Sequence, residues 1–204
     1  MPGGYTEEDF CNSEGMEQLV NCRARLYQAR YVIPACASWG FLAVDSYHRH
    51  AVGISEEQPW LYDHALGGLI GYGHAGMIHG SRLFAGPRTE AVARKWIALY
   101  RRYRETLRGD FLHVAAPDGY HVDAVLHTQA GAAIPAVAVV FNPRDCAQTA
   151  HLCFPLGYAG MTPGSRIVCE GEGALQLDDR STAALTLTLR PYEVRTIAFG
   201  EGHI

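Results

Sequence analysis

Hydrophobic positions recur at different spacings in the two halves of this chain, and the change falls near residue 110. Before that point, apolar residues lie three or four positions apart, which is typical of helices that bury one face. After it, short runs rich in Val, Thr, Leu and Ile alternate with Gly, Pro and Asn, which favours strands joined by turns. The pattern predicts an α/β segment over residues 1–109 followed by an all-β domain over residues 110–204.

Two helices are expected in the first segment. One follows Ser13, with acidic residues in its opening turn and apolar residues on one face, and ends near Tyr31 because Pro34 disfavours helical geometry before it. Its apolar face holds Leu19, Cys22 and Leu26. The second helix begins at Pro87. Its apolar stripe is predicted at Ala93, Trp96, Tyr100, Tyr103 and Leu107.

A buried strand and a glycine-rich stretch separate these helices. The run Trp39 to Asp45 is short and apolar, as in strands that are covered on both faces. Residues 60–80 then hold six glycines from position 67 onward, which argues against a long regular helix because each glycine destabilises a helix by roughly 1 kcal/mol relative to alanine. We expect a helix start there, followed by a tight strand or loop.

Eight short strands are predicted in the second half. Leucines alternate with threonines near residue 185, so that strand should be half-buried, and Asp118-Gly119 and Asn142-Pro143 supply turns. Regular spacing of this kind indicates an antiparallel β-sandwich with its own core. The expected strands are 111–114, 121–128, 136–141, 149–155, 166–169, 174–177, 185–189 and 194–199.

Composition excludes two classes of function. The longest apolar stretches have about half of the ~20 residues that a bilayer span needs, so we expect a soluble protein and no membrane partner. A net charge of −4 provides no cationic surplus for nucleic acid, and the basic side of the helix after Pro87 reads as a solvated outer face. No signal peptide is visible, and the compartment is unknown. The six widely spaced cysteines favour buried thiols over disulfides or zinc ligands.

Two stretches resemble the C-terminal ends of glycoside hydrolases of the alpha-galactosidase type and related (β/α)8-barrel proteins. The first runs from Gly86-Pro-Arg-Thr-Glu90 through Asp110 to Pro117-Asp-Gly119. The second runs from Val139-Val-Phe-Asn-Pro143 through Phe154-Pro-Leu-Gly157 to Leu189-Arg-Pro-Tyr-Glu-Val194 and Phe199. The resemblance implies that the last barrel helix leads into a capping β-sandwich, that Phe-Asn-Pro begins a strand and that Leu-x-Pro opens the last strand.

This resemblance defines the expected fold and domains. A full barrel takes about 250 residues, whereas 109 precede the sandwich here, so the first segment has room for two or three βα units. We therefore expect a partial (β/α)-barrel segment over residues 1–109 plus a C-terminal antiparallel β-sandwich over residues 110–204. The chain would be part of a longer protein lacking its N-terminal portion, or it would self-associate through open sheet edges.

Asp45 is the candidate catalytic residue. It ends a predicted buried strand, and the loops after such strands carry the chemistry in parallel α/β folds. A carboxylate there suits acid/base cleavage of a glycosidic bond, although Asp45 could instead cap the next turn or pair with Arg49. Glu56, Glu57 and Asp63 are further carboxylates, for which solvent exposure or helix capping is the plainer reading.

Aromatic and histidine residues around Asp45 are candidates for binding sugar. Trp39 and Trp60 offer stacking surfaces for a pyranose ring, and the neighbouring histidines and Asp63 offer hydrogen bonds to hydroxyls. The predicted substrate-binding set is Trp39, His48, His50, Trp60, Asp63, His64 and His74. The histidines could alternatively bind a metal with Asp45, but no zinc-binding spacing occurs, and we expect neither metal nor cofactor.

A glycine motif lies between residues 71 and 76. Gly71-Tyr-Gly73-His-Ala-Gly76 has the glycine spacing of a dinucleotide-binding motif, but no clear strand precedes it.

The favoured hypothesis is a glycoside-hydrolase-like fragment with carbohydrate as its ligand and weak or no activity alone. The alternatives are a non-catalytic carbohydrate-binding or structural module, and a small metal-dependent enzyme built on the histidines.

Overall fold

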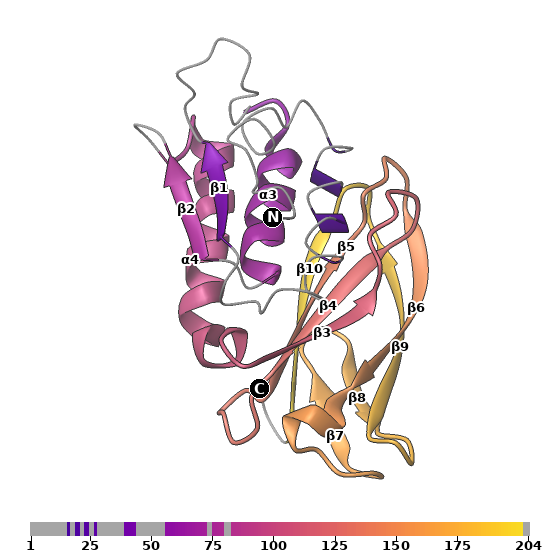
Figure 1. The fold of residues 1–204 in the computed structure, drawn as a ribbon. Coiled ribbons are helices and arrows are strands. Elements are labelled where there is room, and N and C mark those ends of the chain that lie inside the picture. The colour runs from indigo at the N-terminus through magenta and orange to yellow at the C-terminus, as the bar shows by residue number, and fades with distance from the viewer. Residues whose placement is uncertain are drawn as a thin grey trace, which may run out of the picture. The chain divides into compact units, whose positions relative to one another are not determined.

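The computed structural model describes residues 16, 19–20, 23–24, 27, 39–43, 56–72, 75–79 and 83–201, with only the backbone described for 39–43 and 75–79 (Figure 1). The chain divides into two compact units. Unit 1 comprises Met1–Tyr100 and Pro117–Tyr120, and unit 2 comprises Arg101–Ala116 and His121–Ile204. Each unit is described by itself below.

The described part of unit 1 contains a parallel strand pair with a helix between its strands. Strand β1 (Trp39–Ala43) pairs with β2 (Ala75–His79), with Trp39 opposite Ala75 and Ala43 opposite His79. Helix α3 (Pro59–Gly71) lies between them in the chain, and parallel strands need such a crossover. This confirms the strand predicted after residue 39 and the helix-then-strand order predicted for the glycine-rich stretch.

The first predicted helix is helical at every one of its described positions, residues 16, 19–20, 23–24 and 27. Leu19 and Val20 are buried, as the pattern predicts for Leu19, while Cys22 and Leu26 lie outside the described residues. Arg23 is also buried, and its side chain lies 3.7 Å from where a Cβ on Gly68 would be. The Arg23 side chain therefore packs beside Gly68 of α3 at ordinary van der Waals distance.

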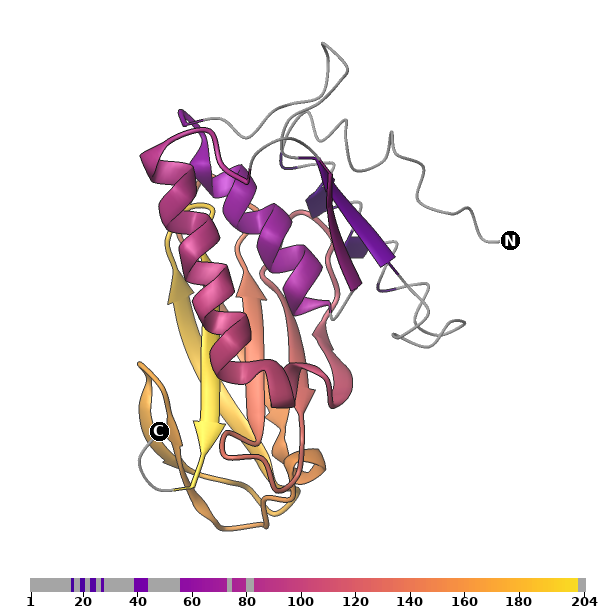
Figure 2. The same ribbon diagram turned by 90° about the vertical axis from the view of Figure 1, so that its left-hand side faces the viewer.

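Helix α4 (Pro87–Leu107) begins at the predicted proline, and Figure 2 shows it beside α3. Ala93, Trp96, Tyr103 and Leu107 are buried as predicted, and the arginines on the other side are exposed. The prediction for Tyr100 was wrong: it is 44% exposed, and Leu99 is buried instead. Since 3.6 residues make one turn, a stripe containing positions 96 and 103 passes between 99 and 100, and packing selects Leu99.

Unit 2 is an antiparallel β-sandwich. All eight predicted strands are present: β3 (Asp110–Ala115), β4 (Asp123–Thr128), β5 (Ala136–Phe141), β6 (Gln148–Pro155), β7 (Arg166–Cys169), β8 (Gly173–Gln176), β9 (Thr182–Leu189) and β10 (Val194–Gly200). Six form a sheet in the order β3-β4-β5-β10-β7-β8, and β6 pairs with β9.

One hydrophobic core joins the two sheets. Leu126, Ala138 and Ile197 from the large sheet belong to the same buried cluster as Phe154 and Leu187 from the small one. The rings of Phe154 and Phe199 meet with their centroids 5.1 Å apart. In β9 the leucines are buried or half-buried while Thr186 and Thr188 are exposed, which confirms the predicted alternation.

Turn residues behave as their chemistry predicts, but two strand boundaries differ from expectation. Asp118 accepts a hydrogen bond from the Tyr120 amide at 2.8 Å, and Gly119 adopts φ +81°. The Phe-Asn-Pro motif ends β5 at Phe141 and does not begin a strand, while Leu189 ends β9 before the final strand opens at Val194. Pro143 follows the end of β5 and Pro191 follows the end of β9, and proline cannot donate a ladder hydrogen bond.

Cysteines in the described part of the chain form no disulfides. Cys169 is a buried thiol, as predicted for the set, whereas Cys146 and Cys153 are exposed, so the expectation of buried thiols was wrong for these two. Cys153 lies on the outer face of β6, where alternate positions point away from the core. No helix among the described residues is long and apolar enough to span a bilayer.

Candidate functional site

The carboxyl ends of β1 and β2 meet at one edge of their sheet. Ala43 ends β1 and is paired with His79, which ends β2. Asp45 follows β1 by two residues in the sequence but lies outside the described residues, as do His48, His50 and His74. Trp39 begins β1 and thus lies about 13 Å along the strand from Ala43, at about 3.3 Å per residue.

Three predicted sugar-binding residues lie on helix α3. Trp60 occupies the first turn and is half-buried. Asp63 and His64 lie one turn further along the helix. His64 is fully buried, and its Nδ1 lies 3.3 Å from Nη1 of Arg23, so this imidazole belongs to the interior of unit 1. The structure therefore brings Trp60, Asp63 and His64 onto one helix.

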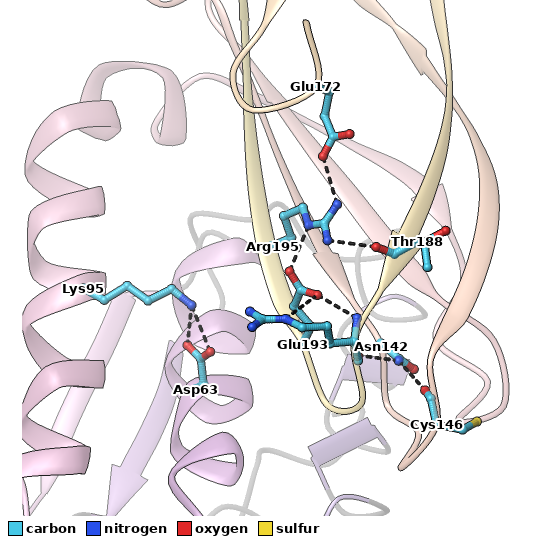
Figure 3. Close-up of polar contacts among 9 residues, drawn as sticks. Asp63, Lys95, Asn142, Cys146, Glu172, Thr188, Glu193 and Arg195 are labelled. Carbon is cyan, nitrogen blue, oxygen red and sulfur yellow. Dashed lines mark hydrogen bonds and ion pairs between the residues drawn. The ribbon is translucent and has the colours of Figure 1, made fainter.

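Asp63 is held by helix α4. Both of its carboxylate oxygens lie 2.9 Å from Nζ of Lys95 (Figure 3). Oδ1 also accepts a hydrogen bond of 2.6 Å from Nε1 of Trp96. Three donor contacts thus occupy this carboxylate. The chain's single lysine is equally engaged, because its ammonium also lies 5.1 Å from the Trp96 ring centroid. This arrangement joins two helices, and the sequence pattern did not predict it.

Glu56 caps the N-terminus of α4. Its carboxylate accepts hydrogen bonds from the amides of Arg88 at 2.9 Å and Thr89 at 2.8 Å, and from the Thr89 hydroxyl. The hydrogen bond from the Thr89 side chain leads the effects that lower the pKa of Glu56. A negative charge at a helix N-terminus is stabilising because it satisfies unpaired amides and opposes the helix dipole. Glu57, its neighbour, is exposed.

Gly86 makes room for this cap. A Cβ at position 86 would lie 2.8 Å from Cδ of Glu56, closer than side-chain atoms approach one another. Thr89 closes the same turn, since its hydroxyl oxygen accepts hydrogen bonds from the amides of Ala85 and Gly86. Two of the three further carboxylates, Glu56 and Asp63, therefore make structural contacts.

The described residues give no support to the two cofactor alternatives. No group of three or more His, Cys, Asp or Glu side chains within the described ranges is placed to hold a metal ion. The dinucleotide-like glycine motif follows helix α3 and leads into strand β2. That order is the reverse of the strand, glycine loop and helix that bind a pyrophosphate.

A polar cluster in unit 2 was missed by the sequence analysis. Arg195 of β10 contacts Glu193 at 3.0 Å and Glu172 at 2.9 Å, and donates to the Thr188 carbonyl at 2.9 Å (Figure 3). It thereby ties the small sheet to the large one. Glu193 is partly buried, which opposes ionisation, yet hydrogen bonds from Arg195 and from the Arg190 amide lower its pKa. The cluster is a structural tie, and Thr188, Glu193 and Arg195 are close in sequence to the Leu-x-Pro motif, whereas Glu172 is not.

Comparison with known proteins supports the fold. No family model and no curated protein matches this sequence. A solved α-galactosidase of family GH36, AgaA from Geobacillus stearothermophilus, is similar in structure with a TM-score of 0.61 and 16% identity, covering 89% of this chain and 24% of that one. The chain thus spans about a quarter of that enzyme's length.

Two further structures belong to the same broad class. A putative α-N-acetylgalactosaminidase from Bacillus halodurans has a TM-score of 0.59 at 14% identity, covering 97% of this chain and 46% of that one. An α-amylase from Geobacillus thermoleovorans has a TM-score of 0.58 at 13% identity, covering 91% of this chain and 47% of that one. The chain therefore has a glycoside-hydrolase-like fold that includes a C-terminal β-sandwich.

Proposed function

We propose that this chain is the C-terminal portion of a glycoside-hydrolase-like protein, with a partial barrel over residues 1–109 and a β-sandwich over residues 110–204. The proposal rests on the order of the helices and strands along the chain. A parallel βαβ unit formed by β1, α3 and β2 is followed by α4, and α4 leads directly into the first strand of the sandwich. Such units are the repeating element of (β/α)8 barrels.

Asp45 is the proposed catalytic carboxylate. It follows β1 in the sequence, and β1 and β2 end at the same sheet edge, which is where barrel enzymes place their chemistry. A carboxylate there would protonate the glycosidic oxygen or stabilise an oxocarbenium-like centre. Trp60 lies in the first turn of the crossover helix, and such a helix runs back from the carboxyl edge of the first strand. Trp39, His48, His50 and His74 complete the proposed sugar-binding set, whereas His64 is fully buried and the Asp63 carboxylate is already bonded to Lys95 and Trp96.

Glycosidic cleavage needs two carboxylates, which stand about 5 to 5.5 Å apart in retaining enzymes. Glu56 caps α4 and Asp63 bonds to Lys95 and Trp96, so neither is available as that second group. We therefore expect little or no hydrolysis by the chain alone. The same observation favours a second function for the chain by itself, a non-catalytic carbohydrate-binding module. The similar AgaA structures were solved with raffinose and with stachyose, which supports carbohydrate as the ligand.

Tryptophan fluorescence tests sugar binding in unit 1, because all three tryptophans precede residue 100 and Trp96 is buried. Titration with galactose and with raffinose should give a saturable change that Trp60→Phe reduces. Mannitol, an acyclic polyol, is the control and should give none. Absence of a saturable change with either sugar, or an unaltered change in Trp60→Phe, contradicts the proposed site.

Hydrolysis of p-nitrophenyl α-galactoside and p-nitrophenyl α-glucoside tests the catalytic part. The chain alone should release no more nitrophenol than its Asp45→Asn variant. Turnover at enzyme-like rates by the wild-type chain would overturn the view that it needs a further portion. Turnover that Asp45→Asn retains would remove Asp45 from the mechanism.

A further inference from the structure

One exposed tyrosine of unit 2 stands on a firmly anchored segment. Tyr158 is 60% exposed and belongs to the short 3-10 helix η2 (Leu156–Ala159). In such a helix, positions three apart share a face. Leu156 is fully buried and Ala159 is 4% exposed, so that face belongs to the core and Tyr158 points away from it. Gly160, with φ +82°, ends the helix.

The turn between β8 and β9 packs against this helix. The amide of Leu156 donates to the carbonyl of Ser181 at 2.9 Å, and a Cβ on Gly157 would lie 3.5 Å from the Ser181 Cβ. Gly157 directly precedes Tyr158, and Ser181 directly follows Arg180. Asp179 and Arg180, both exposed, therefore belong to a turn that contacts the helix at the two residues preceding Tyr158.

The conformation of this turn is locked by its own hydrogen bonds. The Asp178 carboxylate accepts from the amides of Arg180 at 2.9 Å and Thr182 at 2.7 Å. Ser181 adopts φ +56°, a strained value for a residue with a side chain, and is itself buried. The side chains of Asp179 and Arg180 make no hydrogen bond or ion pair with any described residue. Their carboxylate and guanidinium are therefore available to a ligand.

We propose that Tyr158, Asp179 and Arg180 form a surface binding site for a pyranose ring of a polysaccharide. A phenol ring offers a flat apolar face to the C–H face of a sugar, and its hydroxyl can reach the sugar's polar rim. Asp179 would accept hydrogen bonds from sugar hydroxyls and Arg180 would donate to hydroxyl oxygens. Because the segment is already ordered, little conformational entropy is lost on binding.

The local charges favour a neutral sugar over a polyanion. The turn carries Asp178, Asp179 and Arg180, and residues 110–204 hold ten acidic residues against five arginines. Nucleic acids and acidic polymers need a cationic surplus, which is absent from this half of the chain. The inference rests on the proposed function for its ligand class, but it places a second sugar contact in the sandwich, apart from the residues of unit 1.

Affinity electrophoresis in native gels containing galactomannan, or soluble starch, tests the site. At least one polymer should retard the wild-type chain, and Tyr158→Ala should lower the apparent association constant by about tenfold, as expected for losing one stacked aromatic ring. Tyr158→Phe keeps the ring and should retain most of the binding. Tyr120→Ala is the matched control, since Tyr120 is 68% exposed but lies in unit 1, and it should bind like the wild type.

Two outcomes overturn the inference. Equal retardation of wild type and Tyr158→Ala places the sugar elsewhere, and absence of retardation by both polymers shows that the surface binds neither. Neither outcome decides the proposed function of unit 1, which tryptophan fluorescence and hydrolysis report separately because no tryptophan lies in the sandwich. Thermal melting should be unchanged in Tyr158→Ala, since the side chain is mostly exposed, so lost binding would not reflect unfolding.

Discussion

Asn142 and Arg190 are joined by a hydrogen bond of 2.8 Å from the Asn142 side-chain amide to the Arg190 carbonyl, although 48 residues separate them in the chain. The same amide donates to the Cys146 carbonyl, and its oxygen accepts from the Arg144 amide. One buried side chain therefore connects the loop after β5 to the turn between β9 and β10 (Figure 3).

Asn142→Ala should destabilise the protein by about 2 to 3 kcal/mol, because it removes three part-buried hydrogen bonds at roughly 1 kcal/mol each. Asn142→Asp keeps the acceptor for the Arg144 amide but loses both donors, so it should also be destabilising. Urea unfolding followed by circular dichroism gives the free energies. A change below about 0.5 kcal/mol for Asn142→Ala would show that water replaces these contacts.

Glu56→Gln should make the stability of the protein less dependent on acid pH. The folded-state pKa of Glu56 lies below its usual value, first because of the hydrogen bond from Thr89. Its contribution is therefore present above the unfolded pKa of about 4.3 and is lost as the pH falls through the lower, folded value. The difference in melting temperature between wild type and Glu56→Gln should thus be largest near pH 6 and should shrink as the pH is lowered to about pH 3.

Glu57→Gln is the matched control for this pH dependence, since Glu57 is adjacent and exposed. Its melting temperature should follow the wild-type curve at every pH. A Glu57→Gln curve that differs from the wild type as much as that of Glu56→Gln would assign the effect to surface charge and not to the helix cap.

Asp63→Ala should destabilise the protein by about 1 to 3 kcal/mol, because it leaves the Trp96 indole N–H and the Lys95 ammonium without their acceptor. Glu90→Ala removes an exposed pair with Arg94 and should cost less than about 1 kcal/mol. Chemical unfolding of both variants makes the comparison. Equal, small effects would mean that the Asp63 carboxylate is free for another role, such as contact with sugar.

Tyr103→Phe should lower stability by about 1 to 2 kcal/mol. Its hydroxyl donates to the Glu170 carboxylate at 2.6 Å, and this bond leads the effects that lower the pKa of Glu170. Tyr100→Phe, three residues away on the exposed side of α4, should leave the free energy of unfolding within about 0.5 kcal/mol of the wild type. If both variants unfold at the same urea concentration, the Tyr103 bond contributes nothing.

All eight strands of the sandwich were predictable from patterns only a few residues long. Alternating leucine and threonine near residue 185, and turn residues such as Gly119, act through their immediate neighbours. The helix after Pro87 was equally readable, apart from the choice between Leu99 and Tyr100. That choice depends on what packs against the helix, because the two positions lie on either side of the stripe at similar angles from its centre.

The contacts of the candidate site residues could not be predicted from such short patterns. Carboxylates at Glu56 and Asp63 are plausible catalytic groups in a sequence, yet each is occupied by donors 32 or 33 positions away. Residue type gives no information on such partners. The exposed Tyr158 is a similar case, because the turn that contacts its short helix comes two strands later in the chain.

Strand and helix positions followed from the order of residues alone, because period, turn chemistry and proline act over a few neighbours. Strand order, with β10 between β5 and β7, and the partners of Asp63 and Asn142 emerged only in the folded chain. These depend on which distant segments bury one another's apolar faces, and that choice minimises the free energy of the whole chain and not of any one segment.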